Sequence, residues 1–287
     1  MTVSESLVSV EWLAAHQPGP IVLDATAVLP APEFDGDYRL GSGLAAWREA
    51  HIPGSRHADL VGEFSDHAAP RHFTRLAPHA LAMRLSAYGI DDETDIVLYD
   101  SAGGIWAARL WWQLRAIGLA AAVLDGGLGA WRASGLPLEQ GDHGPVPQRA
   151  TGGRIAVDET DAWADIDAVA AISSGDAPGT LVCALGRDQF EGTAPTRYSR
   201  RGRIPGSVNL PARSLVAPDT GLLASDDELR ATLLPLLETQ GPIVVYCGGG
   251  ISATLLALGL VRAGRPDVRI YDGSLEEWTA DPGRAVE

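Results

Sequence analysis

The sequence has few cysteines, a shortage of basic residues and no long apolar run. Only Cys183 and Cys247 occur among its 287 residues, which argues against a disulfide scaffold and for a reducing compartment. There are 22 Lys plus Arg residues against 37 Asp plus Glu, and this formal net charge of −15 disfavours nucleic acid and anionic membrane surfaces as partners. No apolar run approaches the roughly 18 residues of a membrane span, and residues 1–10 lack the segments of a secretory signal. We therefore expect a soluble, cytoplasmic protein that binds neither nucleic acid nor membrane.

The most informative segment is the junction around Cys247. The apolar run Ile243–Tyr246 ends at Cys247, and three glycines, Gly248–Gly250, then lead into an apolar helical stretch. Glycines allow a tight turn whose N–H groups converge, and a helix start adds unpaired donors and the positive end of its dipole. These surroundings favour an anionic, reactive sulfur. A lone cysteine at a strand end is more often a core residue, but the glycines favour the reactive interpretation.

The sequence also repeats itself. Three pairs of similar segments recur in the same order: residues 51–55 with 203–207, 96–105 with 243–252, and 125–131 with 272–278. Matches that keep their order and spacing indicate a tandem duplication. Asp100 stands at the position of Cys247, and a carboxylate there would repel an anion, so we expect the first half to be catalytically inactive.

Short runs of Val, Ile and Leu alternate with longer stretches of helical periodicity. The expected strands are Ile21–Leu23, Ile96–Tyr99, Val123–Leu124, Leu181–Val182, Ile243–Tyr246 and Val268–Tyr271, and the expected crossover helices are Trp106–Gly118 and Ala253–Ala263. Continuous apolar strands between helices are typical of a parallel sheet that is covered on both faces. The sequence therefore predicts an α/β fold with catalytic loops beyond the carboxyl ends of the strands.

The domain boundaries follow from composition. A segment dense in Gly, Pro and polar residues separates the two repeats and is typical of a linker. We expect an inactive N-terminal domain at residues 1–138, a linker at 139–153 and a catalytic C-terminal domain at 154–287.

Taken together, these motifs resemble those of the tandem-domain rhodanese family of sulfurtransferases. The resemblance rests on the duplicated halves, the Ile-Pro-Gly-Ser segments at 52–55 and 204–207, and the loop at 247–252, and it covers nearly the whole chain. It implies two tandem rhodanese-like domains, each a small parallel β-sheet flanked by helices. In that family the first domain is inactive and the second carries a cysteine that takes a sulfane sulfur as a persulfide; Cys247 matches that cysteine.

The resemblance also implies the reaction. A sulfane sulfur would pass from 3-mercaptopyruvate or thiosulfate, both small anions, through the Cys247 persulfide to a thiol or cyanide acceptor, with a thioredoxin-like protein as one candidate. No cofactor and no metal is needed. The loop is closer to the mercaptopyruvate type than to the thiosulfate type, which tends to carry basic residues after the cysteine. Gly249 replaces the hydroxyl residue of many mercaptopyruvate enzymes, which excludes a proton relay through that position.

The substrate-binding arginines depart from the family pattern. The usual Asp-Ala-Arg is replaced by Cys183-Ala184-Leu185, and Gln189 replaces the Arg before Phe190. Other arginines nearby are candidates, because a guanidinium grips a carboxylate with two hydrogen bonds. The predicted site has Cys247 as the catalytic residue and, as substrate-binding residues, Gly248, Gly249, Gly250, Ile251, Ser252, Arg187 and Arg197.

Other polar candidates are assigned minor roles. Cys183 follows an apolar strand start, so we expect an inert core residue there. Five histidines of the first half lack metal-ligand spacing, and we expect packing roles for them, with His72 facing the active site across the domain interface.

Two other functions remain open. One is a non-catalytic rhodanese-like module that binds a partner or relays sulfur only to a cognate acceptor. The other, less favoured, is a cysteine phosphatase, which needs the pattern Cys-x5-Arg; here that position is Ala253, and Tyr246 replaces the usual His before the cysteine.

Overall fold

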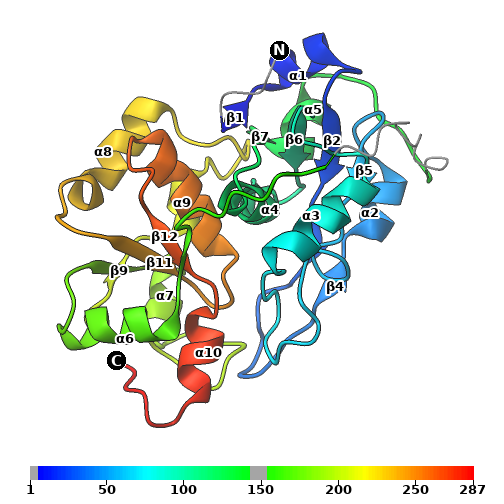
Figure 1. Cartoon of the computed structure of the whole chain (residues 1–287). Helices are drawn as coiled ribbons and strands as arrows, with labels where there is room; N and C mark the ends of the chain where they lie inside the picture. The colour runs from blue at the N-terminus through cyan, green and yellow to red at the C-terminus, as the bar shows by residue number, and fades with distance from the viewer. Residues whose placement is uncertain (1–5, 143–153) are drawn as a thin grey trace.

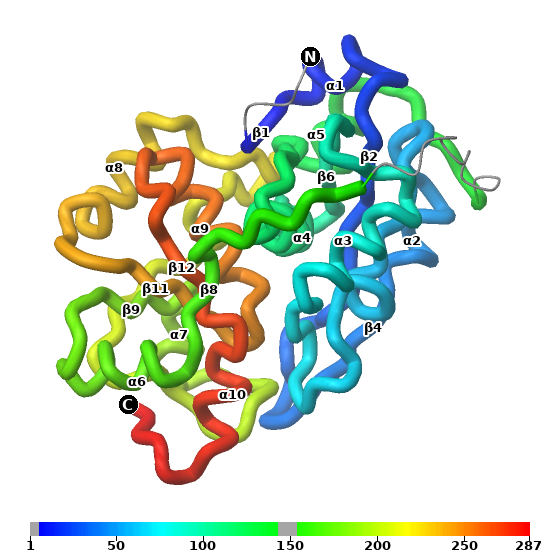
Figure 2. The backbone as a smooth tube through the Cα atoms, viewed as in Figure 1, coloured from blue at the N-terminus to red at the C-terminus, as the bar shows by residue number. Residues whose placement is uncertain are grey.

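The structure, a computed structural model, describes residues 6–142 and 154–287. These residues form two α/β domains, each built on a five-stranded sheet in which all pairings are parallel (Figures 1 and 2). The predicted fold class is confirmed. Residues 143–153, which make up most of the predicted linker at 139–153, lie outside the described residues.

The two sheets have the same strand order. In the first sheet the order is β1 (Leu7–Val8), β7 (Ala122–Leu124), β6 (Ile96–Tyr99), β2 (Ile21–Asp24) and β5 (Arg56–His57). In the second it is β8 (Trp163–Ala164), β12 (Arg269–Tyr271), β11 (Ile243–Tyr246), β9 (Thr180–Cys183) and β10 (Val208–Asn209). An antiparallel pair, β3 (Ala27–Val28) and β4 (Gly41–Ser42), is added to the first domain. The strand-for-strand match agrees with the duplication read from the sequence.

The helices complete each repeat. Those of the first domain are α1 (Val10–His16), α2 (Leu44–Glu49), α3 (Pro78–Ala87), α4 (Ile105–Ala116) and α5 (Gly127–Ala133). Those of the second are α6 (Ile166–Ser174), α7 (Arg187–Phe190), the 3-10 turn η1 (Ala212–Leu215), α8 (Asp226–Leu237), α9 (Ser252–Arg262) and α10 (Ser274–Ala280). The two predicted crossover helices correspond to α4 and α9, each starting one residue earlier than expected. Within the described residues, we find no helix that is both long and apolar enough to cross a bilayer.

Each sheet is covered on both faces, as its apolar strands require. Alternate residues of a strand point to opposite faces, so Leu98 of β6 belongs to one core, whereas its neighbours Val97 and Tyr99 belong to another. In the first domain, α1 and α5 pack on one face and α3 and α4 on the other. In the second, α6 and α10 take one face and α8 and α9 the other.

The two domains meet through α4 and α9, which pack against each other between the two sheets (Figure 1). Both helices are buried around nearly their whole circumference. An apolar face on every side must be covered by more than one neighbour. Each helix is therefore covered by its own sheet and by the other helix, and one continuous core spans both domains. As a result, the loops that precede α4 and α9 lie close to the domain interface.

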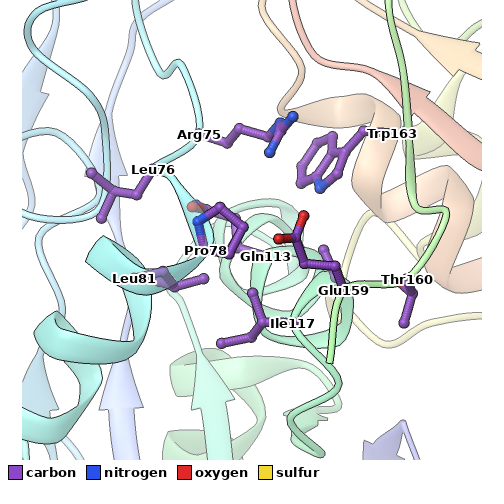
Figure 3. Close-up of a pocket in the computed structure, with 10 residues that line it drawn as sticks. Arg75, Leu76, Pro78, Leu81, Gln113, Ile117, Glu159, Thr160 and Trp163 are labelled. Atoms are coloured by element: carbon purple, nitrogen blue, oxygen red, sulfur yellow. The ribbon is translucent and has the colours of Figure 1, made fainter. Parts of the chain in front are cut away.

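The segment that enters the second domain also lies along the first (Figure 2). At the end of α4, the backbone N–H of Asp158 donates to the carbonyl of Ile117, and that of Thr160 donates to the carbonyl of Ala116, both at 3.0 Å. Figure 3 shows Glu159 and Trp163 of this segment facing α3 and α4 across a small pocket. The chain is thus held against the first domain before it reaches β8.

Gly127, the first residue of α5, is expected to tolerate no side chain. Its φ is +51°, and a Cβ atom there would collide with the Asp100 carbonyl oxygen. We expect Gly127→Ala to lower the free energy of unfolding by about 2 kcal/mol, because both the backbone conformation and the contact are unfavourable. Urea denaturation would measure the loss. The control is Gly129→Ala in the same helix, where a Cβ has no neighbour within 4 Å; a comparable loss in both variants would contradict this explanation.

Candidate active site

Cys247 lies at the carboxyl end of the central strand β11. All four residues of β11 are buried, and the loop that follows leads into α9 at Ser252. The side chain of Cys247 lines a cavity of about 800 Å³ between the domains, although the residue is only 2% exposed. Cys247 is therefore a buried part of the cavity lining, in the position expected for a functional loop of a parallel sheet.

The first domain shows what this loop geometry binds. Asp100, at the equivalent position after β6, is 1% exposed, and its carboxylate accepts four backbone hydrogen bonds. Oδ1 accepts from Ala102 (2.7 Å) and Gly104 (2.9 Å), and Oδ2 accepts from Trp106 (2.7 Å) and Ala107 (2.9 Å). Converging amides at a helix start form an anion site. The sequence analysis expected Asp100 to repel an anion from this turn; in the structure the carboxylate itself fills the turn.

In the second domain the same turn is not filled by a carboxylate. By sequence position, the amides of Gly249, Ile251 and Ala253 correspond to those of Ala102, Gly104 and Trp106 in the first domain, although the backbone at Ile251 (φ −89°) differs from that at Gly104 (φ +83°). Within the described parts of the chain, these three N–H groups donate to no other group. The loop after Cys247 thus has amides available for an anion attached to that sulfur.

Ser274 holds the back of the loop. Its buried Oγ accepts hydrogen bonds from the backbone N–H groups of Cys247 and Gly250, both at 3.1 Å, and donates to the Tyr271 carbonyl at 2.8 Å. Ser274 has φ +48°, close to the +51° of its counterpart Gly127. A positive φ is unfavourable for serine, and the hydrogen bonds of its hydroxyl offset that strain. Sequence reasoning missed Ser274, whose only signal was the repeat partner Gly127.

Most of the predicted site residues meet at the cavity. Those that line it are Cys247, Gly248, Gly249, Ile251, Ser252 and Arg197. Gly250 is absent from this lining: its N–H donates to Ser274 and its carbonyl accepts from Arg109. Arg187 is absent as well, since its side chain is 83% exposed and pairs with Glu191 at 2.8 Å. This placement argues against the substrate role that the sequence suggested for Arg187.

Two arginines line the cavity. Arg197 is half-buried, and its guanidinium donates to the carbonyls of Leu29 and Pro30 in the first domain. Its Nε is buried without a hydrogen-bond partner, and burial lowers the pKa of Arg197 from its usual value. Arg213 of η1 also lines the cavity and is exposed. The sequence analysis missed Arg213, because no motif marks it.

A carboxylate reaches the loop from α10. Glu276 accepts a hydrogen bond from His72 Nδ1 at 2.6 Å, and the His72 ring stacks on Tyr38 with centroids 3.7 Å apart. Glu276 and Tyr38 line the cavity, and a Cβ on Gly249 would lie 3.4 Å from Glu276 Oε2. The missing side chain at 249 therefore leaves room for this carboxylate. Burial and the charge of Glu276 raise the pKa of Tyr38, so its hydroxyl stays protonated.

The second cysteine is a core residue. Cys183 ends β9 and is fully buried. Burial, together with the nearby Cys247, raises the pKa of the Cys183 thiol to about 12. Within residues 6–142 and 154–287, no group of His, Cys, Asp and Glu side chains is arranged to hold a metal ion.

The thiols should differ in reactivity. With its pKa raised to about 12, Cys183 is ionised at pH 8 to roughly one part in ten thousand, and it becomes a thiolate only as the pH rises toward that value. We expect iodoacetamide at pH 8 to label the folded protein once, at Cys247, and the urea-unfolded protein twice. Peptide mapping by mass spectrometry would locate the label. Rapid labelling of Cys183 in the folded protein would contradict the burial argument.

Comparison with known proteins agrees with this geometry. The family model described as "Rhodanese-like domain" matches residues 9–134 and 187–281. The chain is 33% identical over 297 residues to a probable 3-mercaptopyruvate sulfurtransferase of Pseudomonas aeruginosa, covering 99% of this chain and 98% of that protein. It is 30% identical over 308 residues to the mitochondrial thiosulfate/3-mercaptopyruvate sulfurtransferase 1 of Arabidopsis thaliana, covering 100% of this chain and 79% of the relative.

Comparison with solved structures also points to the rhodanese fold. The crystal structure of SseA from Escherichia coli, described as having the rhodanese fold of 3-mercaptopyruvate sulfotransferases, superposes with a TM-score of 0.76 at 27% identity. The match covers 94% of this chain and 99% of that one. The chain therefore belongs to the tandem-domain rhodanese family of sulfurtransferases, as the resemblance in its sequence implied.

Proposed function

We propose that the protein takes a sulfane sulfur from a small anionic donor onto Cys247 and passes it to a thiol or cyanide acceptor. One observation carries this proposal: a turn of amides encloses the Asp100 carboxylate in the first domain, and the turn at the equivalent position of the second domain follows Cys247 beside a cavity. A persulfide is an anion at that position. We place the reaction in the cytoplasm and propose a thioredoxin-like protein as one acceptor.

The transfer has two steps. The Cys247 thiolate attacks the outer sulfur of the donor and forms an S–S bond. With thiosulfate, the donor S–S bond breaks and its electron pair leaves with sulfite; with 3-mercaptopyruvate, the C–S bond breaks and its electron pair leaves as the pyruvate enolate, which then takes up a proton. An acceptor thiolate or cyanide next attacks the terminal sulfur and regenerates the Cys247 thiolate. The loop amides stabilise the negative charge on the terminal sulfur.

The lining of the cavity is suited to 3-mercaptopyruvate. Arg197 and Arg213 can attract a carboxylate, but Glu276 places a negative charge next to Gly249. A thiosulfate dianion is repelled by this charge and attracted by the two arginines more strongly than a mercaptopyruvate monoanion is, so charge alone does not rank the two donors. Apolar residues of the first domain, including Ile105 and Trp106, add a wall suited to a methylene group. We therefore propose 3-mercaptopyruvate as the preferred donor.

Persulfide formation is the direct test. We expect 3-mercaptopyruvate to add the mass of one sulfur atom to the intact protein, and the Cys247→Ser variant to gain none, because the attacking thiolate is missing. The matched control is Cys183→Ser, which should still gain one sulfur, since Cys183 is sealed in the core. If neither donor adds sulfur to the wild-type protein, a non-catalytic binding role is the better explanation.

Substitutions at Arg197 and Arg187 should have different effects on the KM for 3-mercaptopyruvate. Arg197→Gln removes a guanidinium from the cavity lining, and a charge-assisted hydrogen bond contributes about 1.5–3 kcal/mol. We expect the KM for 3-mercaptopyruvate to rise by about tenfold or more. Arg187→Gln breaks only an exposed ion pair and should change KM by less than about twofold. Equal effects of the two substitutions in steady-state assays would refute this assignment.

A further inference from the structure

We propose that Arg109, supplied by the inactive first domain, is a positioning residue for the catalytic loop of the second domain. This inference rests on the proposed function of Cys247. Arg109 lies in the middle of α4 and is 1% exposed. Burying a guanidinium costs free energy unless it is fully paired. The repeat places Leu256 of α9 at the equivalent position, so the fold itself does not require a cation here.

The contacts of Arg109 lead across the interface. Its Nη1 donates to the Gly250 carbonyl at 3.1 Å, and its Nη2 donates to the Phe73 carbonyl at 2.5 Å. The same Nη2 lies 2.7 Å from Asp272 Oδ1. The other oxygen of Asp272 accepts from the backbone N–H of Arg75 at 3.0 Å. The guanidinium therefore joins two segments of the first domain to the catalytic loop and to the residue that follows β12.

Aromatic packing encloses this group. The Arg109 guanidinium lies 5.4 Å from the Trp163 ring centroid, and that of Arg75 lies 5.1 Å from the same ring. Figure 3 shows the Arg75 side chain beside Trp163. A cation over an aromatic face is favourable and is better held when water is excluded. These contacts limit the orientations that the Arg109 guanidinium can adopt.

The hydrogen bond from Arg109 to the Gly250 carbonyl also affects the next backbone N–H, because the peptide group is planar. The carbonyl of Gly250 and the N–H of Ile251 belong to one trans peptide group and point in opposite directions. When Arg109 holds the Gly250 carbonyl, it fixes the direction of the Ile251 N–H. By sequence position, the amide that corresponds to it in the first domain is the N–H of Gly104, which donates to Asp100 Oδ1 at 2.9 Å; the backbone there has φ +83°, against −89° at Ile251. Arg109 thus orients an amide that we assign to the persulfide of Cys247.

The packing around Gly250 leaves its backbone little freedom to adopt another conformation. Its φ is +75°, and a Cβ atom there would lie 3.0 Å from Arg109 Nη1 and 2.9 Å from the Asp272 carbonyl oxygen. Ser274 holds the N–H of the same residue. The peptide groups on both sides of Gly250 are therefore fixed, one by a residue of its own domain and one by Arg109.

Arg115 on the same helix provides a matched control. It also reaches the second domain, where its Nη2 donates to the Pro266 carbonyl at 3.3 Å, and it packs on the Trp111 ring. Among the described residues, Arg115 makes no hydrogen bond or ion pair with the loop after Cys247, and it does not line the cavity. Loss of Arg115 weakens the docking of the domains without touching the sulfur site.

The experiment compares Arg109→Met with Arg115→Met in the full chain. Three quantities are measured: the rate constant for alkylation of Cys247 by iodoacetamide, and the steady-state kcat and KM with 3-mercaptopyruvate. For Arg109→Met we expect kcat to fall by about tenfold to a hundredfold, as for loss of one oriented donor. KM should stay within about twofold, because Arg109 does not line the cavity. The alkylation rate should fall as well, and Arg115→Met should resemble the wild type in all three values.

Three outcomes overturn the proposal: unchanged rates in Arg109→Met, equal losses in both variants, or a loss expressed only in KM. Should Arg109→Met fail to fold, Arg109→Lys retains a buried cation opposite Asp272 but lacks the fork that holds two carbonyls. A wild-type alkylation rate and kcat in Arg109→Lys would also overturn it. If the wild-type protein accepts no sulfur from either donor, the proposed function fails. Alkylation needs no sulfur donor, so the alkylation rates of the variants would still test the role of Arg109.

Discussion

The site depends on one interaction, the attraction between converging main-chain amides and an anion at the end of a central strand. A parallel sheet brings a glycine-rich turn and a helix start to the same place, and their N–H groups cannot all find carbonyl partners there. In the first domain the Asp100 carboxylate satisfies them from within the chain. In the second domain Cys247 stands at that position, and the amides remain for an anion that the sulfur carries.

The first domain contributes directly to the candidate active site. It supplies part of the cavity wall, the Tyr38 and His72 pair that meets Glu276, and the carbonyls that hold Arg197. These contacts exist because α4 and α9 pack together and bring the two loops to one interface. This wall and the buried Arg109 give the first domain a place in the candidate site, although Asp100 stands there where the second domain has Cys247.

Much of the fold could be predicted from the sequence, because the patterns that indicate its strands and turns lie within short segments. The apolar runs that become β6 and β11 are short and uninterrupted, and the glycines after Cys247 indicate the turn. The repeat pattern then gave both domains the same topology. These features depend on neighbouring residues, so no knowledge of the distant chain was needed.

The positions of the arginines could not be predicted from local sequence patterns. Arg187 and Arg197 have the same chemistry and lie ten positions apart, but only Arg197 meets residues 29–30 across the interface. That difference depends on long-range packing, as do the roles of Arg213 and Glu276. Arg109 did leave a signal, since a lone cation within an otherwise apolar stretch of helix is unusual, but its target could be identified only from the structure.

The most direct test of the central claim is a crystal structure of the protein after reaction with a sulfur donor. The account predicts a persulfide on Cys247 whose terminal sulfur lies within hydrogen-bonding distance of the backbone N–H groups of Gly249, Ile251 and Ala253. A terminal sulfur turned away from these amides, or a loop that has to unfold to accommodate it, would contradict the account.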